Sequence, residues 1–279
     1  MREIEVSLVS KRIEELFIKA NKFLPCDIEK ALSSAENNEQ GACKEALNII
    51  NQNLQAAKEL NLPICQDTGL AVVFLEVGQD IHFVGGNLYE AINKGVKDAY
   101  VNGLLRLSVV KDPLNRVNTN TNTPAIIHTK IVDGESLKIT VAPKGMGSEN
   151  MSGIKMLNPS DSKSGVINAV LEIVKNAGSN ACPPMVIGVG IGGNFEECAL
   201  LSKTALIRDI NTSNRNPFYK ELEDELLEKI NELNIGPQGF GGKTTALAVN
   251  VEYFPTHIAG LPVAVNINCH VTRHKTEVI

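Results

Sequence analysis

The sequence predicts an α+β fold in which mixed sheets with hairpins are flanked by helices. Helix-like and strand-like segments do not alternate strictly along the chain, as they would in a doubly wound sheet. Two strand-like runs, 125–131 and 137–143, are separated by Asp133-Gly134, a dipeptide typical of a hairpin turn. No repeat, low-complexity tract or clear linker divides the sequence, so we expect a single large domain over residues 1–279.

Apolar residues recur at helical spacing in several segments, and turn residues mark where these segments end. The apolar stripe of residues 44–60, for example, stops at Asn61-Leu62-Pro63, and Gly178 follows a second such segment. We expect helices over residues 4–22, 27–34, 44–60, 88–102, 164–177, 195–208 and 219–233.

Short apolar runs bounded by Gly, Pro, Asn or Asp predict strands. We expect these over residues 70–75, 125–131, 137–143, 185–189, 244–253 and 261–267. Residues 144–148 read Lys-Gly-Met-Gly-Ser, which indicates a glycine-rich loop after the third strand.

Charge and hydropathy exclude two classes of partner. The chain has 27 basic and 32 acidic residues, so it has no basic excess to neutralise nucleic-acid phosphates. It also lacks the run of about 18 apolar residues that a membrane-spanning helix requires. Residues 1–12 contain no apolar signal-peptide core. We therefore expect a cytoplasmic protein that binds neither nucleic acid nor membrane.

Six cysteines are the residues most informative about chemistry. No two of them form a C-x-x-C pair, which removes the main support for a zinc ribbon or a thioredoxin-like site. Cys43 and Cys198 lie on helical segments, where a thiol is usually a small core residue. Cys65, Cys182 and Cys269 instead lie in proline-marked or polar turns beside apolar strands. Three thiolates would leave one iron of a four-iron cluster open, as Lewis-acid catalysis requires.

The amino-acid sequences of these turns are more informative than the spacing of the cysteines. Residues 63–69 read P-I-C-Q-D-T-G, residues 181–184 read A-C-P-P, and residues 266–269 read N-I-N-C. Residues 117–125 read V-N-T-N-T-N-T-P-A, and residues 240–243 read F-G-G-K. Together, from about residue 40 to the C-terminus, they resemble the class I (iron–sulfur) fumarate hydratase / L-tartrate dehydratase family.

That resemblance implies a cofactor and a reaction. Cys65, Cys182 and Cys269 would hold a [4Fe–4S] cluster in a cluster-binding domain. The enzyme would be a hydro-lyase that reversibly dehydrates a 2-hydroxy-dicarboxylate. We expect conversion of malate to fumarate, because this is the more common activity in the family. L-tartrate is the alternative substrate, since it differs from malate by one hydroxyl group.

The resemblance also implies which residues contact a small dicarboxylate. Asp67 and His257 match catalytic positions, and the residues matching substrate-binding positions are Gln66, Asp67, Arg106 and Gly147. A guanidinium can grip a carboxylate through two parallel hydrogen bonds. Arg106 stands among leucines, which indicates a half-buried and paired side chain. Met146 replaces a glycine of the family's loop.

A partner is implied as well. Members of the family with one long chain carry a further C-terminal domain, whereas this sequence stops soon after Cys269. The resemblance therefore implies an α subunit that is active only with a β subunit, in an α₂β₂ assembly. The catalytic base is expected on that β subunit.

Three other interpretations of the sequence are less favoured. Residues 188–193 fit G-x-G-x-x-G, but Asp209 follows a helix rather than a second strand, so a dinucleotide site is not favoured. We expect these glycines to shape the loop beside Cys182. Residues 236–244 differ from the phosphate-loop pattern at one position, because Pro237 stands where that pattern requires glycine. A non-catalytic iron–sulfur or zinc-binding subunit would need a fourth protein ligand, for which the candidates are His270 and His274.

Overall fold

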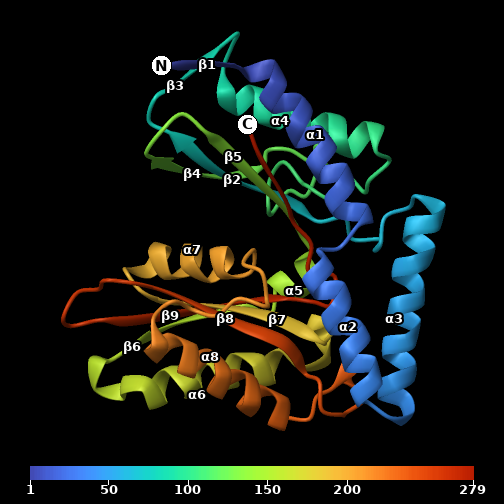
Figure 1. The fold of residues 1–279 in the computed structure, drawn as a ribbon, viewed down its shortest axis with the longest axis vertical. Helices are drawn as coiled ribbons and strands as arrows, with labels where there is room; N and C mark the ends of the chain where they lie inside the picture. The colour runs from blue at the N-terminus through green and yellow to red at the C-terminus, as the bar shows by residue number, and fades with distance from the viewer. The chain divides into compact units, whose positions relative to one another are not determined.

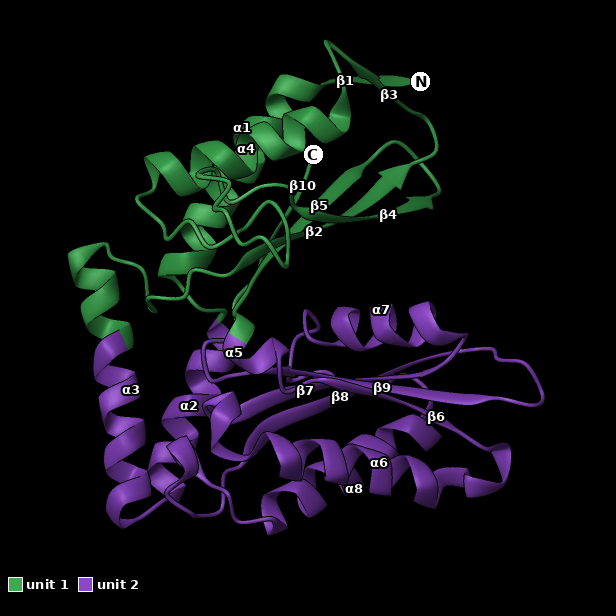
Figure 2. Cartoon of the chain, turned by 180° about the vertical axis from the view of Figure 1, so that it is seen from behind, with its two compact units in different colours: residues 1–25, 54–146, 273–279 green, residues 26–53, 147–272 purple.

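In the computed structural model, which describes all of residues Met1–Ile279, backbone contacts divide the chain into two compact units (Figure 2). Unit 1 consists of Met1–Pro25, Leu54–Met146 and Arg273–Ile279, and unit 2 consists of Cys26–Asn53 and Gly147–Thr272. Both units contain helices packed on mixed sheets, which confirms the α+β class. The single domain over residues 1–279 stays a prediction.

Unit 1 contains a four-stranded sheet in the order β10–β5–β2–β4. These strands are β2 (Leu70–Gly78), β4 (Ile126–Val132), β5 (Leu137–Lys144) and β10 (Lys275–Val278). β2 runs parallel to β4 and antiparallel to β5, and β10 runs antiparallel to β5. A separate parallel pair is formed by β1 (Arg2–Glu5) and β3 (Ile81–Val84).

Two helices of unit 1, α1 (Val6–Lys22) and α4 (Leu88–Asn102), lie side by side (Figure 1). Their buried residues and those of β2 and β5 form one core, in which Phe17 of α1 contacts the ring of Tyr100 of α4. The Asn87 side chain caps α4 by accepting a hydrogen bond from the Glu90 N–H. This core positions the segment that leads into β2.

The predicted hairpin between residues 125–131 and 137–143 is wrong. β2 lies between β4 and β5, so these two strands are not neighbours. The chain does reverse direction at Asp133-Gly134, and the Gly134 carbonyl accepts a hydrogen bond from the N–H of Asp80. A turn dipeptide predicts the reversal, but it does not exclude a third strand from the space between the two arms.

Unit 2 contains a second four-stranded sheet, in the order β6–β9–β7–β8. Its strands are β6 (Gly153–Leu157), β7 (Met185–Gly192), β8 (Ala246–Phe254) and β9 (Leu261–Asn268). β7 is parallel to β8, and β9 is antiparallel to both β7 and β6. Helix α7 (Phe195–Ala205) covers one face, while α6 (Ser162–Ala177) and α8 (Pro217–Glu232) cover the other (Figures 1 and 2).

The remaining helices are α2 (Cys26–Asn38), α3 (Gly41–Leu60) and the short α5 (Met146–Glu149). None of the helices combines the length and the apolar character that crossing a membrane would demand. Every predicted helix and strand is present, but β1, β3, β6, β10 and α5 were not predicted. Each of these has only four or five residues, too few to establish a hydrophobic period.

The glycines of the G-x-G-x-x-G pattern have a packing role. Gly188 and Gly190 lie inside β7, and a Cβ atom at either would lie 2.1 Å from a main-chain oxygen of α7. They therefore allow α7 to pack closely against β7. The prediction that they shape the loop beside Cys182 is wrong, because that loop precedes the strand. Asp209 accepts a hydrogen bond from the Asn211 N–H within a turn.

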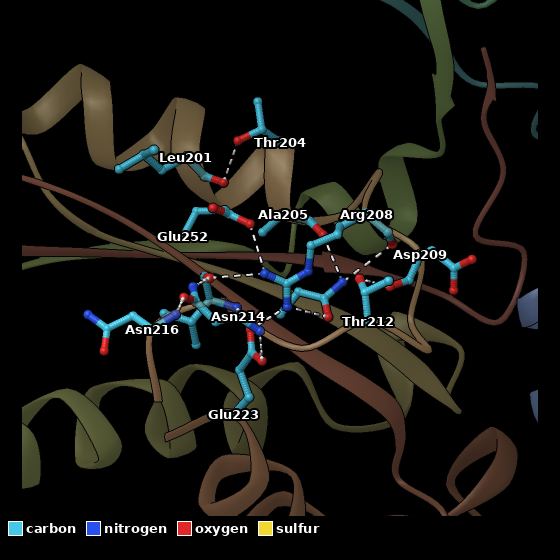
Figure 3. A network of polar contacts seen from close by, with 12 residues as sticks. Leu201, Thr204, Ala205, Arg208, Asp209, Thr212, Asn214, Asn216, Glu223 and Glu252 are labelled. Carbon is cyan, nitrogen blue, oxygen red and sulfur yellow. Dashed lines mark hydrogen bonds and ion pairs between the residues drawn. The ribbon is translucent and has the colours of Figure 1, made fainter. Parts of the chain in front are cut away.

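A polar network around Arg208 joins three elements of unit 2 (Figure 3). Arg208, just beyond α7, donates to Glu252 of β8 at 2.8 Å and to the Val251 carbonyl at 3.2 Å. It also forms an ion pair with Glu223 of α8, whose side chain is 6% exposed. Glu223 in turn accepts a hydrogen bond from the Val251 N–H at 2.8 Å. Both charges of the pair are thus satisfied inside the unit.

Replacing Glu223 with Gln should lower the free energy of unfolding by about 3 kcal/mol, because it leaves the Arg208 guanidinium with less compensating charge in a buried setting. Urea denaturation followed by circular dichroism measures this change. Glu225→Gln is the matched control two positions along α8, since Glu225 pairs with Lys163 at the surface. Equal urea midpoints for the two variants would contradict the prediction.

Candidate functional site

Three of the predicted site residues in unit 1 line one cavity. Cys65, Gln66 and Arg106 belong to its wall, and the cavity has a volume of about 350 Å³. Its complete lining is Leu62, Pro63, Cys65, Gln66, Thr68, Leu104, Leu105 and Arg106. The structure therefore brings together Cys65, Gln66 and Arg106 from two segments that are far apart in the sequence.

The loop that carries Cys65 and Gln66 has no regular secondary structure and is held by buried side chains. The Tyr100 hydroxyl lies 2.8 Å from the Thr68 carbonyl oxygen and 2.9 Å from that of Gly69. The Asn122 amide donates to the same Gly69 oxygen at 3.1 Å. Burial raises the pKa of Tyr100 well above its usual value, so its hydroxyl remains a donor.

Gly69 is required where this loop enters β2. Its φ is +84°, and a Cβ atom at this position would lie 2.7 Å from the main-chain nitrogen of Lys144. Only glycine combines the left-handed conformation with this close approach to β5. The glycine of the P-x-C-Q-D-T-G element is thus explained by backbone packing in unit 1.

Arg106 is fixed through its main chain, and its side chain is exposed. Its N–H donates to the Thr68 hydroxyl at 3.0 Å, and that hydroxyl lies 3.3 Å from the Arg106 carbonyl oxygen. The guanidinium forms no hydrogen bond or ion pair within the chain. The predicted half-buried side chain is wrong, because only Leu105 is buried and Leu104 is 88% exposed. The guanidinium is therefore available to an anionic ligand.

Asp67 is held at both its carboxylate and its main chain. Its Oδ1 accepts a hydrogen bond from the Gly69 N–H, and its Oδ2 accepts one from the Met146 N–H, both at 3.0 Å. Its carbonyl oxygen accepts a hydrogen bond from Arg273. The first contact is an Asx-type turn, whereas the second connects Asp67 to residues 144–148. Gly147, the next residue after Met146, is exposed, and its predicted substrate contact stays a prediction.

In unit 2, Cys182 and Cys269 lie at the same end of the sheet. Cys182 precedes β7 and Cys269 follows β9, and these strands are antiparallel, with Val186 opposite Asn268. The His270 N–H donates to the Cys182 carbonyl oxygen at 3.2 Å, and His270 Nδ1 lies 3.0 Å from that oxygen. Two of the three predicted cluster ligands are therefore on adjoining turns.

The Cys182 turn is also held by Gln238, which sequence reasoning missed. The main-chain N–H and the side-chain amide of Gln238 both donate to the Pro183 carbonyl, at 2.9 and 2.7 Å. The same amide lies 3.2 Å from His270 Nδ1. No sequence pattern links positions so far apart. The contacts of His270 occupy Nδ1, so Nε2 is the ring nitrogen with which it could close a four-ligand site.

His257 is not brought to the cysteines of its own unit. It is exposed in the connection between β8 and β9, and its Nδ1 accepts a hydrogen bond from the Ala259 N–H at 3.1 Å. Cys269 follows the opposite end of β9, and eight strand residues span about 26 Å. The catalytic role predicted for His257 stays a prediction that the geometry of unit 2 does not support.

The six cysteines fall into two environments, and none is in a disulfide. Cys43 and Cys198 are buried, as predicted, and burial raises the pKa of both thiols. Cys26 is exposed; of the three predicted ligands, Cys65 and Cys269 are partly exposed and Cys182 is exposed. Soft thiolates on turns are the donor type that iron–sulfur clusters take, so these three residues fit such a group. Neither unit by itself contains three or more converging metal-ligating side chains.

Comparison with known proteins adds independent information. The model of the fumarate hydratase (Fumerase) family matches residues 10–278. A Methanocaldococcus jannaschii protein with the provisional name L(+)-tartrate dehydratase subunit alpha is 42% identical over 273 residues, which cover 95% of each chain. The L(+)-tartrate dehydratase subunit alpha of Escherichia coli (strain K12) is 35% identical over 254 residues, covering 90% of this chain and 82% of its own.

In the metal-free protein, thiol alkylation should divide the cysteines as their environments do. Cys26, Cys65, Cys182 and Cys269 are expected to react within minutes at neutral pH, whereas Cys43 and Cys198 should react only on unfolding, because they are buried and their raised pKa values disfavour the thiolate. Mass spectrometry of peptides after timed quenching measures each rate. Fast labelling of Cys43 or Cys198 in the folded chain would contradict this division.

Proposed function

Because the chain belongs to the fumarate hydratase (Fumerase) family and is therefore a hydro-lyase, we propose that it is the α subunit of an enzyme that reversibly dehydrates a 2-hydroxy-dicarboxylate. The cavity lined by Cys65, Gln66 and Arg106 is the observation that carries this proposal. It presents an unpaired guanidinium and an amide to a small anion, and its volume suits a small ligand. Malate, with fumarate as its product, is the first substrate to test.

L(+)-tartrate is the second candidate substrate. It is favoured by the names of the relatives from Methanocaldococcus jannaschii and Escherichia coli, both of which refer to L(+)-tartrate dehydratase. Tartrate carries one hydroxyl group more than malate. Discrimination between them would thus depend on whether one buried polar group of the enzyme gains or loses its hydrogen-bond partner.

We further propose that Cys65, Cys182 and Cys269 hold a [4Fe–4S] cluster. Their positions on turns, their accessibility and the softness of thiolate ligands support this assignment. When bound with three thiolates, the cluster would supply a Lewis-acidic iron that stabilises the departing hydroxide.

The side chains of this chain would bind the substrate and donate a proton. Arg106 would bind one carboxylate through parallel N–H···O bonds, with Gln66 and the Gly147 N–H as further donors. Asp67 would hold the proton that the departing hydroxyl group takes up, so that the C–O bond breaks and water leaves. The proton on the neighbouring carbon would be removed by a base on the β subunit, which completes the double bond.

The isolated chain should be inactive even when its cluster has been rebuilt. Activity should appear when it is produced anaerobically together with its β-type partner, because the base is expected there. Fumarate formation from malate is followed by ultraviolet absorbance, and oxaloacetate formation from tartrate by a coupled assay. Full turnover by the isolated chain would refute the need for a partner, and failure of the complex on both substrates would refute the proposed reaction.

Serine at any one of Cys65, Cys182 or Cys269 should reduce bound iron and sulfide to less than about half of the wild-type content, because each thiolate is a ligand. Cys26→Ser is the matched control, since Cys26 is an exposed thiol outside the motifs. Mild oxidation of the wild type should release one iron and give the electron paramagnetic resonance signal of a [3Fe–4S] cluster. A cluster that retains all four irons would indicate a fourth protein ligand, such as His270.

A further inference from the structure

Arg273 is a buried arginine that no sequence motif singled out. It follows the Cys269 turn and is 4% exposed. Its Nε donates to the Pro143 carbonyl of β5 at 3.3 Å, and one of its terminal nitrogens donates to the Asp67 carbonyl. One side chain thus joins the loop of Cys65 and Gln66 to the end of β5, just before residues 144–148.

The Arg273 guanidinium forms no ion pair. Its other terminal nitrogen, Nη1, is buried without a hydrogen-bond partner in the chain. The nearby Asp67 carboxylate is already bound to the N–H groups of Gly69 and Met146. A guanidinium remains charged at any physiological pH, so burying it unpaired destabilises the fold. A buried arginine without an ion pair, bound to the loop that carries Gln66 and Asp67, is a candidate for a functional role.

We propose that Arg273 is a positioning residue, which fixes the main chain of Asp67 and adds positive charge that favours binding of a dicarboxylate. This inference rests on the proposed function, because it assigns Arg273 to the same site. It does not require that Arg273 contact the substrate. Its two effects are separable in kinetics, because misplacement of Asp67 lowers kcat, whereas loss of charge raises KM for a dianion.

The chemistry of the side chain explains why arginine is needed. A planar guanidinium donates in fixed directions to two carbonyl oxygens at once, whereas a lysine ammonium keeps the charge without that geometry. The carbonyls of Thr68 and Gly69 are held independently by Tyr100 and Asn122. Replacing Arg273 should therefore leave most of the loop in place and move chiefly Asp67.

The test compares Arg273→Gln and Arg273→Lys in the cluster-loaded complex with the β-type partner. The Gln variant should show kcat reduced about 30-fold and KM for the dicarboxylate raised about 10-fold. The Lys variant should restore KM to within about twofold of the wild type while kcat stays reduced about 10-fold. Arg116→Gln is the matched control, because Arg116 is exposed and donates only to the Pro113 carbonyl.

Rates are expressed per bound cluster, and thermal stability is measured in parallel. If Arg273 has only a structural role, both variants will lose stability or cluster content while kcat per cluster and KM stay unchanged, and that result overturns the inference. If the Gln variant does not assemble, the Lys variant alone decides through its reduced kcat with unchanged KM. A wild-type complex without turnover would overturn the proposed function, and this inference with it.

Discussion

The hydrogen bonds from Tyr100 and Asn122 to the carbonyls of Thr68 and Gly69 are the interaction on which the candidate site depends. Residues 63–69 contain no helix or strand that could satisfy their own carbonyl groups, and an unsatisfied buried carbonyl is costly. Buried donors from α4 and from the 117–125 segment supply the missing partners. The loop can therefore be irregular and rigid together, which allows Cys65, Gln66 and Asp67 to project from a fixed backbone.

In unit 2, the main chain of a cysteine turn is also fixed, but by different contacts. The sheet of this unit places the turns of Cys182 and Cys269 at one end because β7 and β9 are antiparallel, and Gln238 and His270 then bind the carbonyls of the Cys182 turn. The glycines inside β7 let α7 pack directly on the strand that follows Cys182. In both units, then, an accessible thiol lies on a turn whose main chain is fixed by side chains from distant segments.

Local patterns predicted much of this organisation from the sequence. They separated the core thiols Cys43 and Cys198 from the accessible ones, because a helical stripe and a proline-marked turn differ over a few residues. They failed where distant segments decide the outcome. The sequence near Asp133 does not indicate that β2 lies between the two flanking strands. The sequences near Gln238 and Arg273 likewise do not indicate which carbonyl groups these side chains bind. Arg106 was misjudged because neighbouring leucines do not determine which of them is buried.

The distribution of charge supports the assignment of the site in a protein whose net charge is −5. An acidic protein that binds a dianion must hold local positive charge that its own carboxylates do not neutralise. Two half-buried arginines, Arg208 and Arg12, are neutralised: Arg208 pairs with Glu223 and Glu252, and Arg12 pairs with Glu15 and Glu277. Arg106 and Arg273 form no ion pair. The Arg106 N–H donates to the Thr68 side chain, and the Arg273 side chain donates to the Asp67 carbonyl. With no ion pair at these two arginines, the chain keeps local positive charge next to Asp67, as the proposed binding of a dicarboxylate requires.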